Sequence, residues 1–225
     1  MYNHLGNARQ CKTLIRHGKI SVNGTIIYDP VYQVRYSDIL QFQNRILDSQ
    51  PFTYIMLNKP QGYICASRDQ KEKCVVELIE NQDCFCLGRL DKNTTGLVIL
   101  TNDKSLKKLL LPENHVKKSY FVTTRKILLP EIVEQFHQGV IIDQDVRCLP
   151  ADLEIVDDHH GIVTIEEGKY HQIKKMFLSV NNQVVLLHRH SFGPIILDSG
   201  LKPGKWRYLT ISEREKLLNV CKKEL

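Results

Sequence analysis

The sequence predicts an α+β fold in which helices flank a mixed, mostly antiparallel sheet. Short apolar runs rich in β-branched residues recur between turn residues, as at 97–101 and 162–165, and such runs are typical of strands. Helical periodicity occurs in fewer segments, such as 170–180. The length of 225 residues, with 42% hydrophobic and 25% charged residues, fits either one large soluble domain or a small and a medium one.

The composition argues against a secreted or membrane-bound protein. No apolar run approaches the roughly 18 residues that span a bilayer, and the first residues lack the charged-then-apolar pattern of a secretory signal. We therefore expect a cytoplasmic protein that does not bind a membrane. The seven cysteines are scattered without a Cys-x-x-Cys pair, so we expect no zinc site and no disulfides, and most of them buried and reduced.

Positive charge is concentrated near the N-terminus. The net charge is +6, and residues 1–50 hold six Lys or Arg against three Asp, so half of the excess lies in less than a quarter of the chain. Such a concentration indicates a polyanionic partner, although a solvated surface that only aids solubility is the alternative.

The N-terminal residues predict a helix and then a hairpin. Residues 8–19 have the pattern of an amphipathic helix that ends at Gly18 or in the turn after it. At about 100° per residue, its basic residues fall within roughly an 80° arc. These residues are Arg9, Lys12, Arg16 and Lys19. Residues 20–27 then alternate around Asn23-Gly24, a strong signal for a tight hairpin because both turn positions need positive φ.

A basic helix followed by the hairpin sequence Lys-Ile-Ser-Val-Asn-Gly resembles the small α/β RNA-binding domain named after ribosomal protein S-four. The resemblance implies such a domain over residues 1–48, with the four basic residues along the phosphates of an RNA. Members of that family open with a longer first helix, so we expect a domain that is truncated at its start. Residues 43–51 are polar and irregular, and they predict a linker.

The second part of the chain begins with a predicted strand at 54–57. The strand ends in a turn, since Pro60 lacks a backbone donor and Gly62 allows positive φ. Lys59 stands in this turn, where it either faces RNA or is simply an exposed lysine, and the residues leave both readings open. Residues 74–80 predict a short helix.

Asp91 stands between polar loop residues and an apolar strand. Residues 97–101 form a continuous apolar run, which predicts a strand buried on both faces, and 91–96 are residues that shape tight loops. A carboxylate on a short loop against a rigid strand is a common place for a catalytic group. The alternative is that Asp91 only bonds the backbone of its own turn.

The remaining residues complete the sheet and its helices. We expect a helix capped by Asn102 or Asp103, and another from Pro130 to Gly139. Ser212 and Glu215 predict the capping box of a C-terminal helix. Further strands are predicted at 117–123, 140–142, 151–156, 162–165, 184–187 and 206–209.

Two segments resemble the pseudouridine synthases. Residues 88–103 contain Gly-Arg-Leu-Asp, Thr-Thr-Gly-Leu, an apolar strand and Thr-Asn-Asp, which together resemble the family's catalytic motif. The resemblance is to the RsuA-type branch that modifies ribosomal RNA, and it implies a catalytic domain over 52–225 with Asp91 as the nucleophile. Residues 167–177 resemble the segment whose basic residue pairs with that aspartate and keeps it ionised, which is Lys174 here.

The same resemblance implies roles for two more residues. Tyr120 matches the aromatic residue that lies against the target base, and its phenol could also move a proton. Arg89 matches a residue that fills the space left by the flipped nucleotide. A core tyrosine and a solvated lysine are the alternatives for Tyr120 and Lys174, and a structural or RNA-facing role suits His171 better than that of a general base.

Uridine isomerisation moves one bond without oxidation or added atoms, so the resemblance implies neither a cofactor nor a metal. We expect a monomer that binds ribosomal RNA, either free or in a partly assembled small subunit. Met-Leu-Asn-Lys-Pro-Gln-Gly and Leu187–Arg189 favour the small-subunit (16S) branch. The alternatives are a large-subunit synthase of the same family and a non-catalytic RNA-binding assembly factor. A metal-dependent nuclease is disfavoured, since no residues occur at metal-ligand spacing.

Overall fold

The computed structural model describes residues 5–35, 38–47, 52–79 and 83–222. The chain divides into two compact units, Met1–Phe52 and Thr53–Leu225, and each of them contains a β-sheet. Within the described ranges, no helix is both long and apolar enough to cross a membrane.

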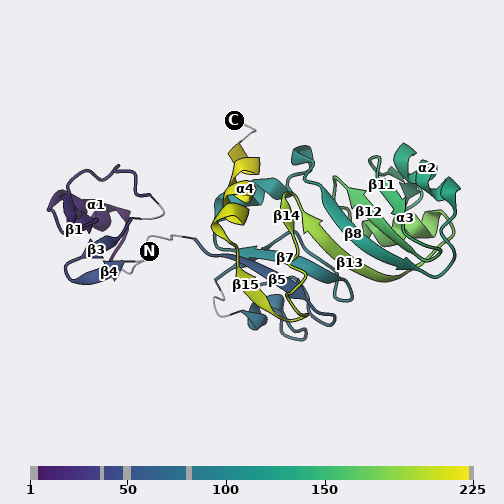
Figure 1. The fold of residues 1–225 in the computed structure, drawn as a ribbon, viewed down its shortest axis with the longest axis horizontal. Helices are drawn as coiled ribbons and strands as arrows, with labels where there is room; N and C mark the ends of the chain where they lie inside the picture. Colours follow the sequence, from purple (N-terminus) through teal and green to yellow (C-terminus); the bar gives the residue numbers. More distant parts are fainter. Residues whose placement is uncertain (1–4, 36–37, 48–51, 80–82, 223–225) are drawn as a thin grey trace. The chain divides into compact units, whose positions relative to one another are not determined.

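The small unit contains one helix, α1 (Ala8–Arg16), and a four-stranded antiparallel sheet in the order β2-β1-β3-β4 (Figure 1). Its strands are β1 (Ile20–Val22), β2 (Thr25–Ile27), β3 (Leu40–Phe42) and β4 (Arg45–Leu47). Asn7 and Gln10 form a capping box that starts the helix. The helix ends at Arg16, so the predicted extension to Lys19 is wrong: Gly18 has φ +63 and turns the chain toward β1.

Two tight turns of the small unit bear on the predictions, because one confirms a predicted hairpin and the other lies where a linker was predicted. Asn23 and Gly24 have φ of 51 and 81, which confirms the predicted hairpin between β1 and β2. Gln43 and Asn44 form the turn between β3 and β4, with Gln43 at φ 54. The first part of the predicted linker is therefore wrong, because its polar residues belong to a second hairpin. Its end, at 48–51, lies outside the described residues.

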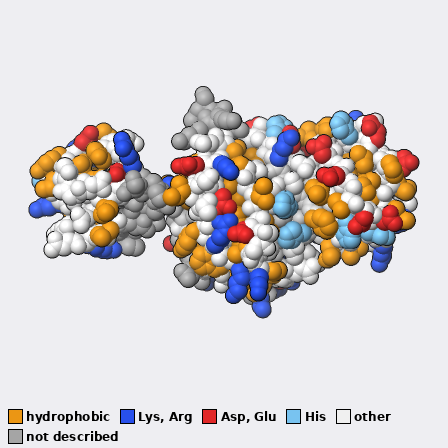
Figure 2. Space-filling model, in the orientation of Figure 1, with side chains coloured by type: hydrophobic (Ala, Val, Ile, Leu, Met, Phe, Trp, Pro, Cys, Tyr) orange, Lys and Arg blue, Asp and Glu red, His pale blue; other side chains and the backbone are white. Residues whose placement is uncertain are grey.

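Figure 2 shows Lys and Arg side chains at several places on the visible face of the small unit. The side chains of Arg9, Lys12, Arg16 and Lys19 are all exposed. On the other side of α1, Cys11, Leu14 and Ile15 are half-buried, as the amphipathic pattern predicts.

The large unit is built on a nine-stranded sheet. Its main path runs β11-β12-β8-β13-β7-β5-β15, while β14 pairs with β13 and β6 pairs with β7. Among the described named strands, β13 and β7 are parallel and the other paired strands are antiparallel, so the predicted mixed, mostly antiparallel sheet is confirmed. The strands are β5 (Tyr54–Lys59), β6 (Phe85–Leu87), β7 (Thr95–Thr101), β8 (Lys118–Thr124), β11 (Asp152–Ile155), β12 (His160–Ile165), β13 (Val184–Phe192), β14 (Ile195–Ile196) and β15 (Trp206–Tyr208). A separate two-stranded sheet pairs β9 (Ile141–Ile142) with β10 (Val146–Arg147).

Helices cover the two ends of this sheet. At one end (Figure 1), α2 (Pro130–Gln138) packs against β11, and α3 (Gln172–Ser179) packs against β9 and β13. At the other end α4 (Ile211–Lys222) lies near β14. The other helical segments are 3₁₀ turns: η1 (Val75–Leu78), η2 (Lys104–Leu110) and η3 (Pro112–Asn114). The predicted helix from Pro130 to Gly139 is confirmed, and Gly139 ends it at φ 80.

The two central strands are buried on both faces. Ile55 and Leu57 of β5 belong to the hydrophobic core on one side of the sheet, and Tyr54 and Met56 belong to the core on the other. The residues of β7 alternate in the same way, and Leu97 to Leu100 have no exposed surface. This burial confirms the prediction made from the apolar run, and it gives the loop before β7 a rigid support.

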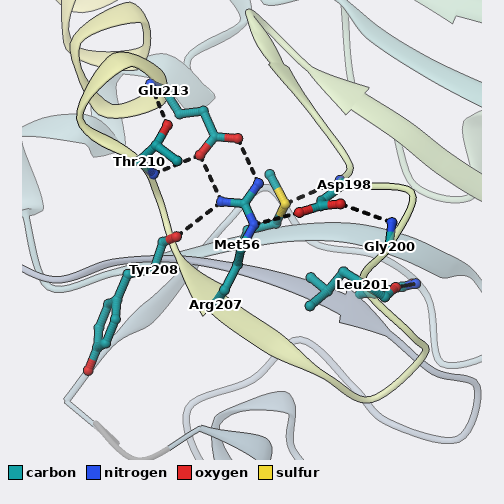
Figure 3. A network of polar contacts seen from close by, with 9 residues as sticks. Met56, Asp198, Gly200, Leu201, Arg207, Tyr208, Thr210 and Glu213 are labelled. Atoms are coloured by element: carbon teal, nitrogen blue, oxygen red, sulfur yellow. Dashed lines mark hydrogen bonds and ion pairs between the residues drawn. The ribbon is translucent and has the colours of Figure 1, made fainter.

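A polar network fastens α4 to the sheet (Figure 3). The Arg207 guanidinium on β15 donates to both carboxylate oxygens of Glu213 at 2.8 Å and, through Nε, to Asp198 at 2.8 Å. Glu213 also accepts a hydrogen bond from the Thr210 amide, and Thr210 Oγ1 accepts one from the Glu213 amide. The C-terminal capping box is therefore Thr210/Glu213, and the predicted pair of Ser212 and Glu215 is wrong by two residues.

Candidate active site

Asp91 lies on the short loop between β6 and β7, and its carboxylate faces the ammonium group of Lys174 and the imidazole ring of His171. Oδ2 lies 2.7 Å from Lys174 Nζ, and Oδ1 lies 3.4 Å from His171 Nε2. Both partners come from the start of α3, far away in sequence. A turn residue would instead accept hydrogen bonds from the amides that follow it. Asp91 is therefore more than a turn residue, and with 27% of its side chain exposed it can meet a ligand.

The start of α3 holds these two partners in place. Lys174 is in the first turn of the helix, and His171 precedes the helix with φ 53, a left-handed conformation that turns the chain sharply. Residues 171 and 174 are three apart, so they lie on the same side of a helical turn. Because of this spacing, both side chains reach the same carboxylate.

Lys59 is buried and holds the Asp91 loop through hydrogen bonds to its backbone. Its side chain has no exposed surface, and Nζ donates to the backbone carbonyls of Pro60, Lys92 and Thr94 at 3.2, 3.1 and 2.7 Å. Burial lowers the pKa of Lys59 to about 8. Both sequence interpretations, an RNA-facing lysine and an exposed turn lysine, are wrong, because Lys59 continues the buried strand β5 instead of standing in the turn.

Arg189 is a second buried residue that holds the Asp91 loop by hydrogen bonds, and we call such a residue a brace. The sequence did not predict this role. It is 1% exposed, and it donates from Nε to the Leu97 carbonyl at 2.7 Å and from NH2 to the Gly88 carbonyl at 3.1 Å. One guanidinium thus joins the residues before and after the Asp91 loop. The predicted strand stopped at residue 187, whereas β13 continues to Phe192 and carries Arg189 into register with Gly96.

Gly96 allows this close approach between β7 and β13. A Cβ atom at this position would lie 2.3 Å from the Arg189 carbonyl oxygen, and the residue has φ 102. Both features exclude other residues without a shift of one strand. The glycine therefore fixes the distance between Arg189 and the loop that it braces.

Cys65 supplies a third contact to the loop. Its Sγ accepts a hydrogen bond from the Leu90 amide at 3.3 Å, directly before Asp91. A hydrogen bond from the Cys86 thiol lowers the pKa of Cys65 and raises the pKa of Cys86. Cys65 is buried, as expected from the sequence for most of the cysteines, but it is an acceptor as well as a packing residue.

Tyr120 lies on β8, in register with Arg189 on β13. It is 7% exposed and belongs to the hydrophobic cluster that also contains Leu90 and Ile173, neighbours of Asp91 and Lys174 respectively in sequence. Arg89 is exposed beside Leu90. The structure thus gathers Asp91 and Lys174 directly, and it places Tyr120 in the same core.

The site is suited to nucleophilic or acid–base chemistry by a carboxylate. A lysine ammonium group donates a charge-assisted hydrogen bond to the Asp91 carboxylate at 2.7 Å. Three buried contacts hold its loop, so little reorganisation is needed when a substrate binds. Among the described residues, no group of three or more His, Cys, Asp or Glu could hold a metal ion.

Comparison with known proteins points to one family. A profile described as RNA pseudouridylate synthase matches residues 53–179, and one described as S4 domain matches residues 4–40. The chain is 37% identical to the ribosomal small subunit pseudouridine synthase A of Pseudomonas aeruginosa, over 91% of this chain and 92% of that protein. The corresponding enzyme of Escherichia coli (strain K12) is 36% identical, over 88% and 89%.

A solved structure shares the fold as well. The crystal structure of a pseudouridylate synthase superposes with a TM-score of 0.71 at 35% identity, and the match covers 93% of each chain. An RNA pseudouridine synthase of Bacillus subtilis (strain 168) is 36% identical, over 92% of this chain and 91% of that protein. The similarity therefore spans both units of the chain.

Proposed function

We propose that this chain, which belongs to the RNA pseudouridylate synthase family, isomerises a uridine of small-subunit ribosomal RNA to pseudouridine. The observation that carries the proposal is the Asp91 carboxylate, which lies 2.7 Å from Lys174 on a loop braced by buried residues. The names of the relatives support the small-subunit target, and their similarity covers about nine tenths of each chain.

In the proposed reaction Asp91 is the nucleophile and Lys174, 2.7 Å away, is its charge partner. The Asp91 carboxylate bonds to ribose C1′ as the bond from C1′ to uracil N1 breaks; the uracil turns, and C5 then bonds to C1′ as the bond from C1′ to Asp91 breaks. The proton of C5 leaves to solvent and N1 takes up a proton, so the atoms balance without an external reagent. Tyr120 lies against the base and can move a proton through its hydroxyl group. Arg89, exposed beside the loop, occupies the place of the flipped nucleotide.

The small unit, an S4 domain, would hold the RNA near the reacting nucleotide. The exposed residues Arg9, Lys12, Arg16 and Lys19 suit electrostatic contacts with phosphates. We infer that the enzyme acts as a monomer on free RNA or on a partly assembled small subunit. Because bacteria make this RNA in the cytoplasm, we infer that compartment for the enzyme.

Two other functions are less well supported. A large-subunit target is possible within the same family, but the relatives from Pseudomonas aeruginosa and Escherichia coli are named for the small subunit. A non-catalytic RNA-binding assembly factor would have no use for a carboxylate paired with a lysine and held by three buried braces.

The test is release of tritium from small-subunit ribosomal RNA labelled at uracil C5. The protein should release tritium from this RNA and not from labelled large-subunit RNA. Asp91→Asn keeps the size of the side chain but removes the nucleophile, so its release should vanish while its RNA affinity stays within a few-fold. Normal turnover by Asp91→Asn would rule out the assigned nucleophile, and release from large-subunit RNA alone would rule out the target.

A further inference from the structure

We infer that Tyr170 stacks against a nucleotide that flanks the target uridine, and so helps to hold the RNA while that uridine is flipped. The inference rests on the proposed function, because it requires an RNA bound at Asp91. It concerns a second nucleotide, distinct from the flipped uridine assigned to Tyr120.

The first observation is that the aromatic ring of Tyr170 is exposed to solvent. Tyr170 is 74% exposed, although its side chain is largely apolar. A single exposed aromatic residue is ordinary on a protein surface, so exposure alone indicates nothing. The position of the ring next to the candidate site is what makes the exposure informative.

A stack of two rings connects Tyr170 with Asp91. The rings of Tyr170 and His171 lie 3.8 Å apart with an angle of 20° between their planes. His171 in turn lies 3.4 Å from Asp91 through Nε2. The tyrosine ring is therefore separated from the carboxylate by one aromatic layer. The Lys175 ammonium group also lies over the ring, 5.2 Å from its centroid, but 74% of Tyr170 is exposed, so a base can still reach the ring.

The turn that carries Tyr170 is rigid. Glu167 Oε1 accepts hydrogen bonds from the Leu149 amide at 2.9 Å and from Gln172 Nε2 at 2.7 Å. Gln172 Oε1 accepts one from the Lys169 amide at 2.9 Å. These bonds fix the chain on both sides of Tyr170 and His171. A ring held in this way loses little conformational entropy when a base stacks on it.

The proposed ligand is a base next to the flipped uridine. When one nucleotide leaves a stack, its neighbours lose a stacking partner, and an aromatic face can replace that partner for any base. The Lys175 ammonium group over the ring is ion-paired with the Asp143 carboxylate, so it adds little net charge beside the proposed base. Tyr120 is already assigned to the flipped uridine, so a flanking base needs a different aromatic ring.

The experiment uses the full-length protein and tritiated small-subunit ribosomal RNA. Once sequencing of the product has located the pseudouridine, two RNAs are made with an abasic site immediately 5′ or 3′ of that uridine. Tyr170→Ala should raise the RNA concentration for half-maximal rate by roughly tenfold, and Tyr170→Phe should restore most of the loss because it keeps the ring. Tyr208→Ala is the matched control, since Tyr208 is also exposed (56%) but lies on β15.

The abasic RNAs separate stacking from a structural effect. One of them should bind the wild-type protein roughly tenfold more weakly, and should bind Tyr170→Ala no more weakly than intact RNA does. If both abasic RNAs bind the wild-type protein as well as intact RNA does, the inference is wrong while tritium release still supports the proposed function. Equal binding of intact RNA by Tyr170→Ala and wild type contradicts the inference in the same way. If wild-type protein releases no tritium, the proposed function and the inference both fail.

Discussion

The backbone carbonyls of Lys92 and Thr94, on the loop that carries Asp91, both accept hydrogen bonds from the buried Lys59 ammonium group. A buried cation is costly unless its hydrogen bonds are satisfied, and three carbonyls satisfy this one. The position of the reacting carboxylate therefore depends on a residue that does not bond to it.

We predict that Lys59→Met lowers both stability and rate. Methionine fills a similar volume but removes the ammonium donor from three carbonyls, of which that of Lys92 keeps a second donor, the Gly62 amide. We expect the free energy of unfolding to fall by roughly 1–3 kcal/mol. The single-turnover rate at saturating RNA should fall as well, because the loop is no longer fixed. Denaturant unfolding and tritium release measure the two effects.

Lys92→Met is the control for this change. Lys92 stands on the same loop, but its side chain is 47% exposed and forms an ion pair with Glu72. Such exposed pairs contribute less than about 1 kcal/mol. If Lys59→Met were as stable and as fast as wild type, the brace would have no role in holding Asp91.

Tyr120→Phe tests the proposed proton transfer. The variant keeps the buried ring and loses only the hydroxyl group, so RNA affinity should stay within about twofold. We expect a single-turnover rate constant roughly 100-fold lower, a usual contribution of a general acid or base. Rapid-quench measurement of tritium release at saturating RNA gives this constant. An unchanged value would limit Tyr120 to holding the base.

At the scale of elements, local patterns predicted most of the strands and helices but not their connections. The strand β7 and the helix that begins at Pro130 each follow from a pattern of neighbouring residues, and both were predicted. The brace at Asp91 joins residues about a hundred positions apart, such as Arg189 and Gly88, and no local pattern reports such a pair. One signal was present: Lys59 lies two residues after Leu57, so in a continued strand it shares the side of Ile55 and Leu57, and it is buried when that side is covered.

The network at α4 makes a prediction about pH. Hydrogen bonds from Arg207 lower the pKa of Glu213 to about 2 from 4.5. Because the folded-state pKa is depressed, the stabilisation is fully present above pH 4.5 and is lost as the pH falls toward 2. At pH 7 we expect Glu213→Gln to lower the free energy of unfolding by roughly 1–2 kcal/mol, a value reduced for partial exposure. Thermal unfolding across this pH range should show the difference between the two proteins shrink below pH 4.5.

Glu215→Gln is the matched control for Glu213→Gln. Glu215 is exposed on the same helix, and the sequence pattern assigned it the capping role that the structure gives to Glu213. Its substitution should leave stability at pH 7 nearly unchanged. A larger loss from Glu215→Gln than from Glu213→Gln would contradict the network in Figure 3.

At the scale of the whole molecule, the proposed roles assign chemistry to one unit and general RNA attachment to the other. The carboxylate, its charge partner and the braces all belong to the large unit, whereas the exposed basic residues of α1 belong to the small one. Phosphate contacts are not sequence-specific, so the small unit would contribute affinity rather than a choice of nucleotide. The two contributions can be measured separately, because only the affinity from phosphate contacts depends steeply on salt concentration.

The basic residues of α1 give the prediction that tests this division. If Arg9 and Arg16 contact phosphates, replacing both with Gln should reduce the slope of log affinity against log salt by roughly 1–2 units, since each contact contributes about 0.7–0.9. Filter binding across a range of salt concentrations measures the slope. The single-turnover rate at saturating RNA should hold, because the reaction is assigned to Asp91 in the other unit. Arg35 and Arg45, exposed in the same unit but outside α1, form the control pair, and replacing them with Gln should change the slope less. An unaltered slope in a folded Arg9/Arg16 variant would mean that α1 is a solvated surface and that the RNA is held elsewhere.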